Sequence, residues 1–218
     1  MNRIERRRRE TRRRILDAAL DLFSLQGLSQ TTIANITERV DIGKGSFYEH
    51  FQAKDDLICH LLRDGYDDLL GIIEEKISTS EDLNSRAAEV LRAQWVHSTR
   101  DRRFFRFIHQ VRGLLKLKVV GEEKDFIGLE FRRFVNRLID ILLAPEDRDR
   151  PERREEMVVV ACTLAGSGSG YLSYRMVLEG NVPGEEELQV LQNVLIPGLM
   201  KSKLKNKIAG VREKRVAS

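Results

Sequence analysis

At 218 residues, 41% of them apolar and 33% charged, the chain can hold a small domain and a larger one, and its composition is that of a soluble globular protein. The net charge of +4 is unevenly distributed: residues 1–14 and 201–218 each carry +6, so the residues between them sum to −8. This distribution excludes a general polyanion-binding surface. No apolar run approaches the ~20 residues of a membrane-spanning helix, so we expect a cytoplasmic protein with no membrane partner.

Helical periodicity runs through the sequence and strand signals are nearly absent, which predicts an all-α fold. Thr31 can act as the N-cap of the second helix, and Gly27 ends the first. The predicted N-terminal helices span 11–27, 32–40 and 44–51, and a long fourth helix begins at Lys54. Five more are predicted, at 82–99, 101–117, 123–143, 152–179 and 184–206, separated by turns at 78–80, at Gly121, at 145–151 and at 181–184.

Residues 32–51 have the pattern of a helix-turn-helix, in which two short helices joined by a tight turn are braced by a longer one. The apolar stripe that this unit hides consists of Ile33, Ile36, Val40, Ile42, Phe47 and Phe51. The last helix is left with Lys44, Gly45, Ser46, Tyr48, Glu49 and His50. These groups are short or polar, so they can approach phosphates and base edges in a major groove.

Residues 9–69 resemble the DNA-binding domain of the TetR family of transcriptional regulators over its full length. The most specific part is the segment Tyr48-x-His50-Phe51 followed by Lys54. The chain departs from the family pattern with Thr37 for a usual Ala, Asp41 for a common Gly, and Gly43 for the usual Ser N-cap. These departures bear on the DNA sequence that is read, because a Gly cap costs only a few tenths of a kcal/mol.

The resemblance implies roles for individual residues. Those that contact phosphates are Thr32, Ser46, Tyr48, His50 and Lys54, and those nearest the base edges are Lys44, Gly45 and Tyr48. For the arginines of residues 6–14 two interpretations stay open: contact with phosphates or an adjacent minor groove, or a solvated, disordered tail.

The resemblance also implies the architecture. A three-helix helix-turn-helix domain, residues 9–69 with the motif at 32–51, precedes a regulatory domain at 70–206 for ligand binding and dimerisation, which has six helices when the helix from Lys54 is counted. Residues 207–218 form a flexible basic tail. Two protomers pair through the last two long helices, and an effector moves the connecting helix and so changes the spacing of the recognition helices.

The resemblance further implies an effector pocket among the middle helices. Its candidate lining residues are Trp95, Phe105, His109, Arg112 and Phe131, and core packing is the alternative for each aromatic ring. This lining favours a small apolar or amphipathic effector.

Other patterns indicate no further chemistry. The run AGSGSG at 165–170 lacks the preceding strand and the Lys-Ser/Thr of a phosphate loop, so we interpret it as a small-residue helix face with Ala161, Ala165 and Gly168. The histidines and the carboxylates lack the spacing of a metal site or a catalytic group. The same holds for Cys59 and Cys162, which we expect to be reduced. We therefore predict no cofactor, metal or catalytic residue.

The function predicted is that of a repressor that binds a palindromic double-stranded DNA operator as a homodimer and is released by its effector. Three alternatives stay open: an activator of the same family, an enzyme that uses the C-terminal domain, and a nucleoid-type DNA binder without operator specificity. The acidic body of the chain argues against the last of these, and the absence of a catalytic constellation argues against the second.

Overall fold

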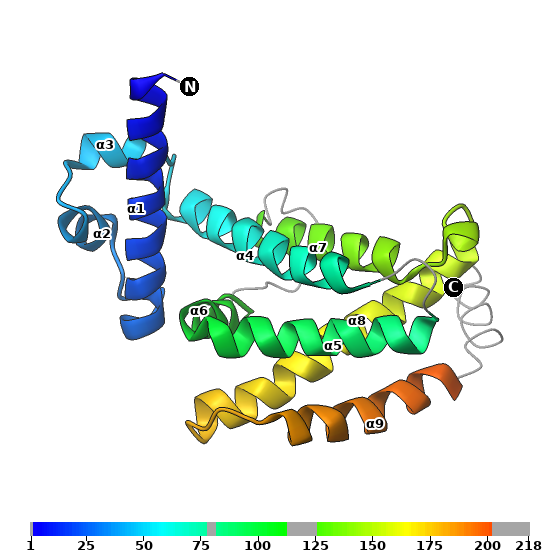
Figure 1. The fold of residues 1–218 in the computed structure, drawn as a ribbon. Coiled ribbons are helices and arrows are strands. Elements are labelled where there is room, and N and C mark those ends of the chain that lie inside the picture. Colours follow the sequence, from blue (N-terminus) through cyan, green and yellow to red (C-terminus); the bar gives the residue numbers. More distant parts are fainter. Residues whose placement is uncertain (1, 78–81, 113–125, 202–218) are drawn as a thin grey trace, which may run out of the picture. The chain divides into compact units, whose positions relative to one another are not determined.

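The structure is a computed structural model that describes residues 2–77, 82–112 and 126–201. These residues form nine α-helices and contain no strand (Figure 1), which confirms the predicted all-α fold. They divide into two compact units, one of Met1–Leu70 and His97–Phe134, the other of Gly71–Val96 and Val135–Ser218. None of the described helices combines the length and hydrophobicity that crossing a bilayer requires.

The first helix, α1 (Arg3–Gln26), begins well before the predicted residue 11. Asn2 and Glu5 form a capping box at its start: the Asn2 side chain accepts the Ile4 amide, and the Glu5 carboxylate accepts the Asn2 amide, both at 3.3 Å. Residues 6–14 are therefore part of a regular helix and do not form the disordered tail that was one of the two interpretations.

The first unit is built around the contact between α1 and α6 (Arg102–Arg112). The buried rings of Phe23 and Phe107 stack at 5.7 Å between centroids. One turn before Phe107, Arg103 donates to Asp17 at 3.1 Å and to Asp21 at 2.6 Å. Apolar packing and ion pairing thus hold α6 against α1.

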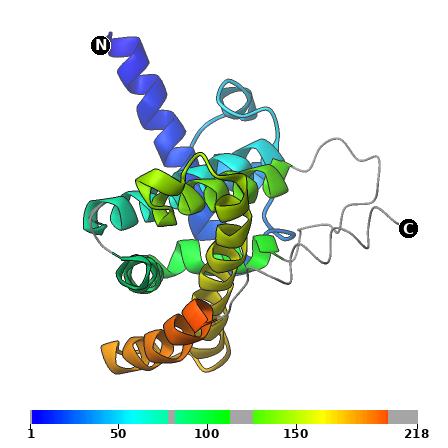
Figure 2. The same cartoon turned by 90° about the vertical axis from the view of Figure 1, so that its right-hand side faces the viewer.

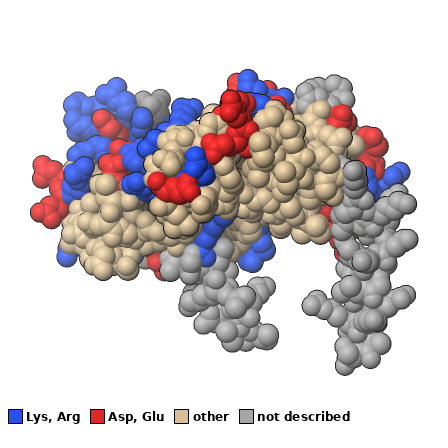
Figure 3. Space-filling view, turned by 90° about the horizontal axis from the view of Figure 1, so that it is seen from below, with Lys and Arg blue, Asp and Glu red and all other residues tan. Residues whose placement is uncertain are grey.

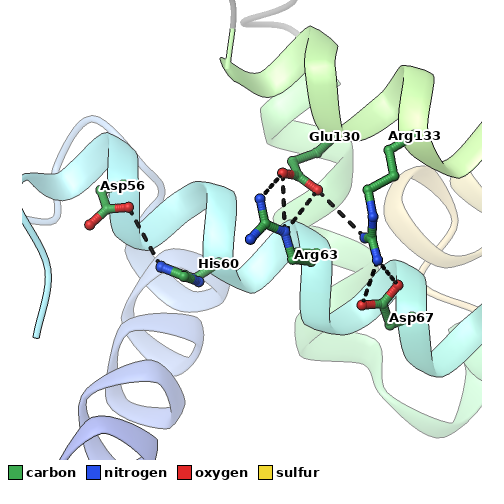
Figure 4. Close-up of polar contacts among 6 residues, drawn as sticks. All are labelled: Asp56, His60, Arg63, Asp67, Glu130 and Arg133. Atoms are coloured by element: carbon green, nitrogen blue, oxygen red, sulfur yellow. Dashed lines mark hydrogen bonds and ion pairs between the residues drawn. The ribbon is translucent and has the colours of Figure 1, made fainter.

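The unit also contains α2 (Ile33–Arg39), α3 (Lys44–Tyr48) and the first part of α4 (Lys54–Lys76). Figure 4 shows how α4 is joined to the start of α7 (Phe126–Leu142) by charged side chains. Glu130 is only 6% exposed and accepts hydrogen bonds from both Nε and Nη2 of Arg63. Arg133, one turn later, donates to Asp67 at 2.8 Å. Because a buried carboxylate is costly without a partner, Arg63 makes the burial of Glu130 possible.

The second unit holds most of α5 (Leu83–Arg100), the end of α7, the short 3-10 helix η1 (Pro145–Asp147), α8 (Pro151–Ser173), a π-helical turn (Tyr174–Leu178) and α9 (Glu185–Lys201). Figure 2 shows α9 (orange) beside α8 (yellow). The AGSGSG run lies inside α8, as predicted. A Cβ atom on Gly168 would lie 2.4 Å from Oε1 of Gln94 on α5, so the small residue permits the close approach of α5.

Other predicted elements agree within a few residues, but some lie outside the described residues. These are the helix ends predicted at 113–117, 123–125 and 202–206, the turns predicted at 78–80 and Gly121, and the tail predicted at 207–218. The third helix is shorter than predicted, since α3 ends at Tyr48.

Candidate DNA-binding interface

The start of α2 is capped by Thr32 and not by Thr31, which corrects the prediction. The Thr32 hydroxyl accepts the Asn35 amide at 3.2 Å, and the Asn35 side chain accepts the Thr32 amide at 3.0 Å. Thr31 is fully buried and donates its hydroxyl to the carbonyl of Gly27 at 2.8 Å. Thr31 therefore closes the loop after α1, and Thr32 is left at the surface as the cap.

The turn between α2 and α3 accommodates two of the departures from the family pattern. Asp41 has φ +52°, a left-handed conformation that glycine adopts most easily and that Asp tolerates better than most residues. The buried hydroxyl of Thr37 donates to the Ala34 carbonyl at 3.0 Å, so it is satisfied within α2. Neither departure prevents the tight turn that a helix-turn-helix needs.

The recognition segment buries one side and exposes the other, as the sequence predicts. Phe47 and Phe51 are buried with ring centroids 5.6 Å apart, whereas Tyr48 is 56% exposed. Lys44 and Gly45 are exposed at the start of α3, and a Cβ atom on Gly45 would meet no atom within 4 Å. Ile33 and Ile42, expected in the hidden stripe, are only half-buried, as is Ser46. The face that carries Lys44 and Tyr48 is thus free to enter a groove, and its DNA contacts stay a prediction.

Lys54 has a contact that the sequence does not reveal. Its ammonium group donates to the carbonyls of Leu28 at 2.9 Å and Thr31 at 3.1 Å. Two of its three donors therefore hold the loop that precedes α2, and one is left for a phosphate. Sequence reasoning missed this structural role, because a loop carbonyl is not recognisable in a sequence.

His50 follows α3 and is half-buried. Burial, and then the positive charge of Arg8, lower the pKa of His50 from its ordinary value, while Glu49 opposes this effect. The imidazole is accordingly neutral at pH 7 in the free protein. A phosphate beside it would favour the charged form.

Three arginines of α1 contact the helix-turn-helix, which the sequence analysis did not predict. Arg8 donates to the Glu49 carbonyl at 3.3 Å, and Arg14 donates to the Val40 carbonyl. The guanidinium of Arg12 lies 5.2 Å from the centre of the Phe51 ring, a cation–π geometry. The four-residue spacing of Arg8 and Arg12, on the face of α1 that continues to the buried Ile15, is the signal that could have indicated two of these contacts.

The five candidate effector residues do not form one cluster within either unit. Trp95 belongs to the second unit, where it is buried and stacks on Tyr171 at 5.9 Å. The other four, Phe105, His109, Arg112 and Phe131, belong to the first unit, where Phe105 is buried and His109 is exposed. Cavities of about 350, 270 and 630 Å³ are lined by other residues. The effector-binding role of these five residues therefore stays a prediction.

An all-α chain with a braced helix-turn-helix and an exposed recognition helix has the architecture of helix-turn-helix DNA-binding proteins. A sequence model described as "Bacterial regulatory proteins, tetR family" matches residues 15–61. Residues 15–61 are thus similar to the tetR family of regulatory proteins, as the resemblance in the sequence indicated. The described residues hold no group of three His, Cys, Asp or Glu side chains placed to bind a metal ion.

Individual transcriptional regulators are also similar to this chain in sequence or in fold. The HTH-type transcriptional repressor KstR2 of Rhodococcus jostii is 38% identical over 76 residues, which cover 35% of this chain and 36% of that protein. The transcriptional regulator FadR from Bacillus subtilis, solved in complex with stearoyl-CoA, superposes with a TM-score of 0.61 at 18% identity over 86% of this chain and 97% of that one. A tetR-family regulatory protein from Rhodococcus RHA1 gives 0.59 at 16% identity, covering 85% and 95%. The sequence match to KstR2 thus spans about a third of that protein, and the structural matches show a common fold.

Proposed function

We propose that the chain is a transcriptional repressor that binds a palindromic DNA operator as a homodimer and is released by a small effector. The observation that carries this proposal is the exposed face of α3, with Lys44, Gly45 and Tyr48, above the buried Phe47. One such helix reads only a few base pairs, so useful specificity needs two copies about 34–36 Å apart. The matched relative KstR2 is named a repressor, which supports repression over activation.

The surfaces of α8 and α9 support pairing of two protomers. Valine side chains are exposed on both helices, and on α9 Val190 and Val194 are 62% and 69% exposed at a spacing of four residues. On α8 the residues Val158, Cys162, Gly166 and Gly170 are exposed at the same spacing. Seen from below, where α9 lies in Figure 1, much of the surface lacks charged side chains (Figure 3). Rows of residues four apart on two helices interdigitate in the commonest helix packing, so this face suits a second copy of the chain.

An effector that is apolar or amphipathic fits the aromatic side chains of α6 and the start of α7, and the acyl-CoA bound by the FadR of similar fold is amphipathic. We propose that such a molecule binds near Phe105 and Phe131 and lowers DNA affinity. Stearoyl-CoA is the first probe: it should weaken operator binding by the wild type, and Phe105→Ala should reduce that response.

Selection of DNA from a random library with the purified protein tests the central proposal. We expect a palindrome, a dimer by light scattering, and much weaker binding to a single half-site. The variant Val190→Glu/Val194→Glu should be monomeric and bind the palindrome weakly. Leu25→Glu, at a side chain 74% exposed on α1, is the matched control and should stay dimeric. A monomeric wild type that binds one half-site as tightly as the palindrome would rule the proposal out.

A further inference from the structure

The eight arginines of residues 3–14 of α1, here called the arginine arm, fall into two sets. Arg8, Arg12 and Arg14 contact the helix-turn-helix through the Glu49 carbonyl, the Phe51 ring and the Val40 carbonyl. The side chains of the other five are exposed and have no hydrogen bond or ion pair with the described residues. They are Arg3, Arg6, Arg7, Arg9 and Arg13. The first set thus holds the arm in place, and the second set is free to bind something else.

The contacts that Arg8 and Arg12 make with the helix-turn-helix determine where the free arginines lie. Arg8 and Arg12 are one turn apart on α1, and their partners Glu49 and Phe51 directly follow the recognition helix. Figure 1 shows the N-terminal turns of α1 beside α3. A duplex that receives α3 in its major groove therefore passes close to the arginine arm.

The arm is ordered before any partner binds. Its capping box at Asn2 and Glu5 satisfies the first amides, and residues 3–26 contain neither glycine nor proline. Arginine is among the better helix formers. A partner that contacts a preformed helix does not have to offset the entropy of ordering it.

The charge of the arm identifies its partner. Arg6 and Arg9 lie three residues apart on the helix surface and Arg9 and Arg13 four apart, spacings at which like charges repel. Only Glu5 and Glu10 oppose the eight arginines, and Glu5 is used in the cap. Figure 3 shows Lys and Arg gathered at the end of the view that holds α1. A row of unpaired cations beside a groove-reading helix matches the regular negative charge of a DNA backbone.

We propose that the free arginines of the arm contact the phosphate backbone outside the base pairs that α3 reads, so that the footprint of each protomer extends into flanking DNA. This inference rests on the proposed operator binding. From Arg3 to Arg12 the helix extends about 14 Å at 1.5 Å per residue, a reach of about four base pairs. The arm adds affinity without sequence preference, while Lys44 and its neighbours supply specificity.

The test compares Arg3→Gln/Arg6→Gln/Arg7→Gln with the wild type and keeps all three holding arginines. The control Arg102→Gln/Arg106→Gln/Arg132→Gln removes the same charge from exposed positions on α6 and α7 whose side chains have no hydrogen bond or ion pair with the described residues. Affinity is measured on the selected palindrome with long flanks and with flanks trimmed to the palindrome, over a range of salt concentrations. Hydroxyl-radical footprinting maps the protected backbone.

On long DNA we expect the arm variant to lower the slope of log K against log salt by about 0.9 per lost phosphate contact, hence about 2.7 per protomer. Trimming the flanks should weaken wild-type and control binding more than binding by the arm variant, which keeps Arg9 and Arg13, and protection of the flanks by the arm variant should shrink. Equal slopes, equal sensitivity to trimming and an unchanged footprint for all three proteins would overturn the inference. A wild type that selects no palindrome would instead contradict the proposed function.

Discussion

The side chain of Gln110 on α6 binds the C-terminal end of α1, where its Nε2 donates to the Phe23 carbonyl at 2.9 Å. Its Oε1 accepts the amide of Leu28 at the same distance. Between these two backbone groups lies Gly27, whose φ of +92° lets the chain leave the helix. The Gln110 side chain thus gives the Phe23 carbonyl a second donor beside the Gly27 amide and satisfies the amide of Leu28, at the start of the loop that leads to the helix-turn-helix.

Replacing Gln110 by Met keeps the side-chain volume but removes both hydrogen bonds. Because the two backbone groups are part-buried, we expect the free energy of unfolding to fall by about 1–3 kcal/mol in urea titrations. Amide exchange at Leu28 should accelerate. The exposed Arg106→Met on the same helix is the control and should stay within about 0.5 kcal/mol of the wild type. Equal midpoints for both variants would contradict this account.

Two glycines of α4 give opposite expectations for the same substitution. A Cβ atom on Gly65 would lie 2.0 Å from the Phe104 ring, whereas one on the exposed Gly71 would meet nothing within 4 Å. Gly65→Ala should therefore lower the melting temperature, because Phe104 has to move from a buried site. Gly71→Ala should raise stability by roughly 0.5–1 kcal/mol, since alanine favours the helix. A stabilised Gly65→Ala would show that α6 can shift without cost.

The helices and the recognition face were predictable because their signals are local. Burial of Ile15, Ala19 and Phe23 at four-residue intervals is a property of one helix, and so is the opposition of Phe47 to Tyr48. The bond between Gln110 and Phe23 joins residues 87 positions apart, and a polar side chain carries no periodic signal. The same reason hides the role of Lys54 in the loop after α1.

The start of α1 was missed for a different reason. The apolar stripe begins at Ile15, so a prediction from periodicity begins the helix near residue 11. The observed start at Arg3 depends on the capping box of Asn2 and Glu5, a short polar pattern within a charged run. Capping patterns in charged segments therefore extend what hydrophobic periodicity alone can predict.

Lys54 and Tyr48 are both predicted to contact phosphates, but their substitution should differ in effect on stability. Lys54→Met leaves the carbonyls of Leu28 and Thr31 without their donor, so we expect a loss of about 1–3 kcal/mol in unfolding free energy as well as weaker DNA binding. Tyr48→Ala, at an exposed site, should weaken binding to all DNA sequences and change stability by about 0.5 kcal/mol or less. Urea titration and gel-shift assays separate the two effects. An unchanged stability of Lys54→Met would show that water replaces its ammonium group.

Lys44 should determine base preference, because it is exposed at the start of α3 on the face of Tyr48. Selection from a random DNA library with Lys44→Ala should relax the preferred bases at one position of each half-site. Each lost base contact costs about 1–3 kcal/mol of discrimination. The control is His50→Gln, at a residue predicted to contact only phosphate, which should lose affinity but select the same sequence. Identical sequence preferences for Lys44→Ala and the wild type would show that Lys44 contacts only phosphates.

DNA affinity should rise as the pH falls, through His50. In the free protein burial and Arg8 lower the pKa of His50, so the imidazole is neutral at pH 7. A phosphate beside it stabilises the imidazolium and raises the pKa in the complex, so binding takes up a proton between the two pKa values. Log K should therefore increase by up to one per pH unit for each bound protomer, measured by fluorescence anisotropy from pH 8 to pH 5.5.

The stability of the free protein should fall as the pH falls, whereas its DNA affinity should rise. Since the pKa of His50 is lower in the folded state than in the unfolded chain, the unfolded state binds more protons, and stability is lost as the pH falls through the ordinary histidine pKa of about 6.5. His50→Gln should abolish the pH dependence of DNA binding and reduce that of stability. His109→Gln, at an exposed position on α6, should leave the DNA effect intact. If His50→Gln retains the wild-type pH profile of affinity, His50 does not contact a phosphate, and the proton is taken up elsewhere.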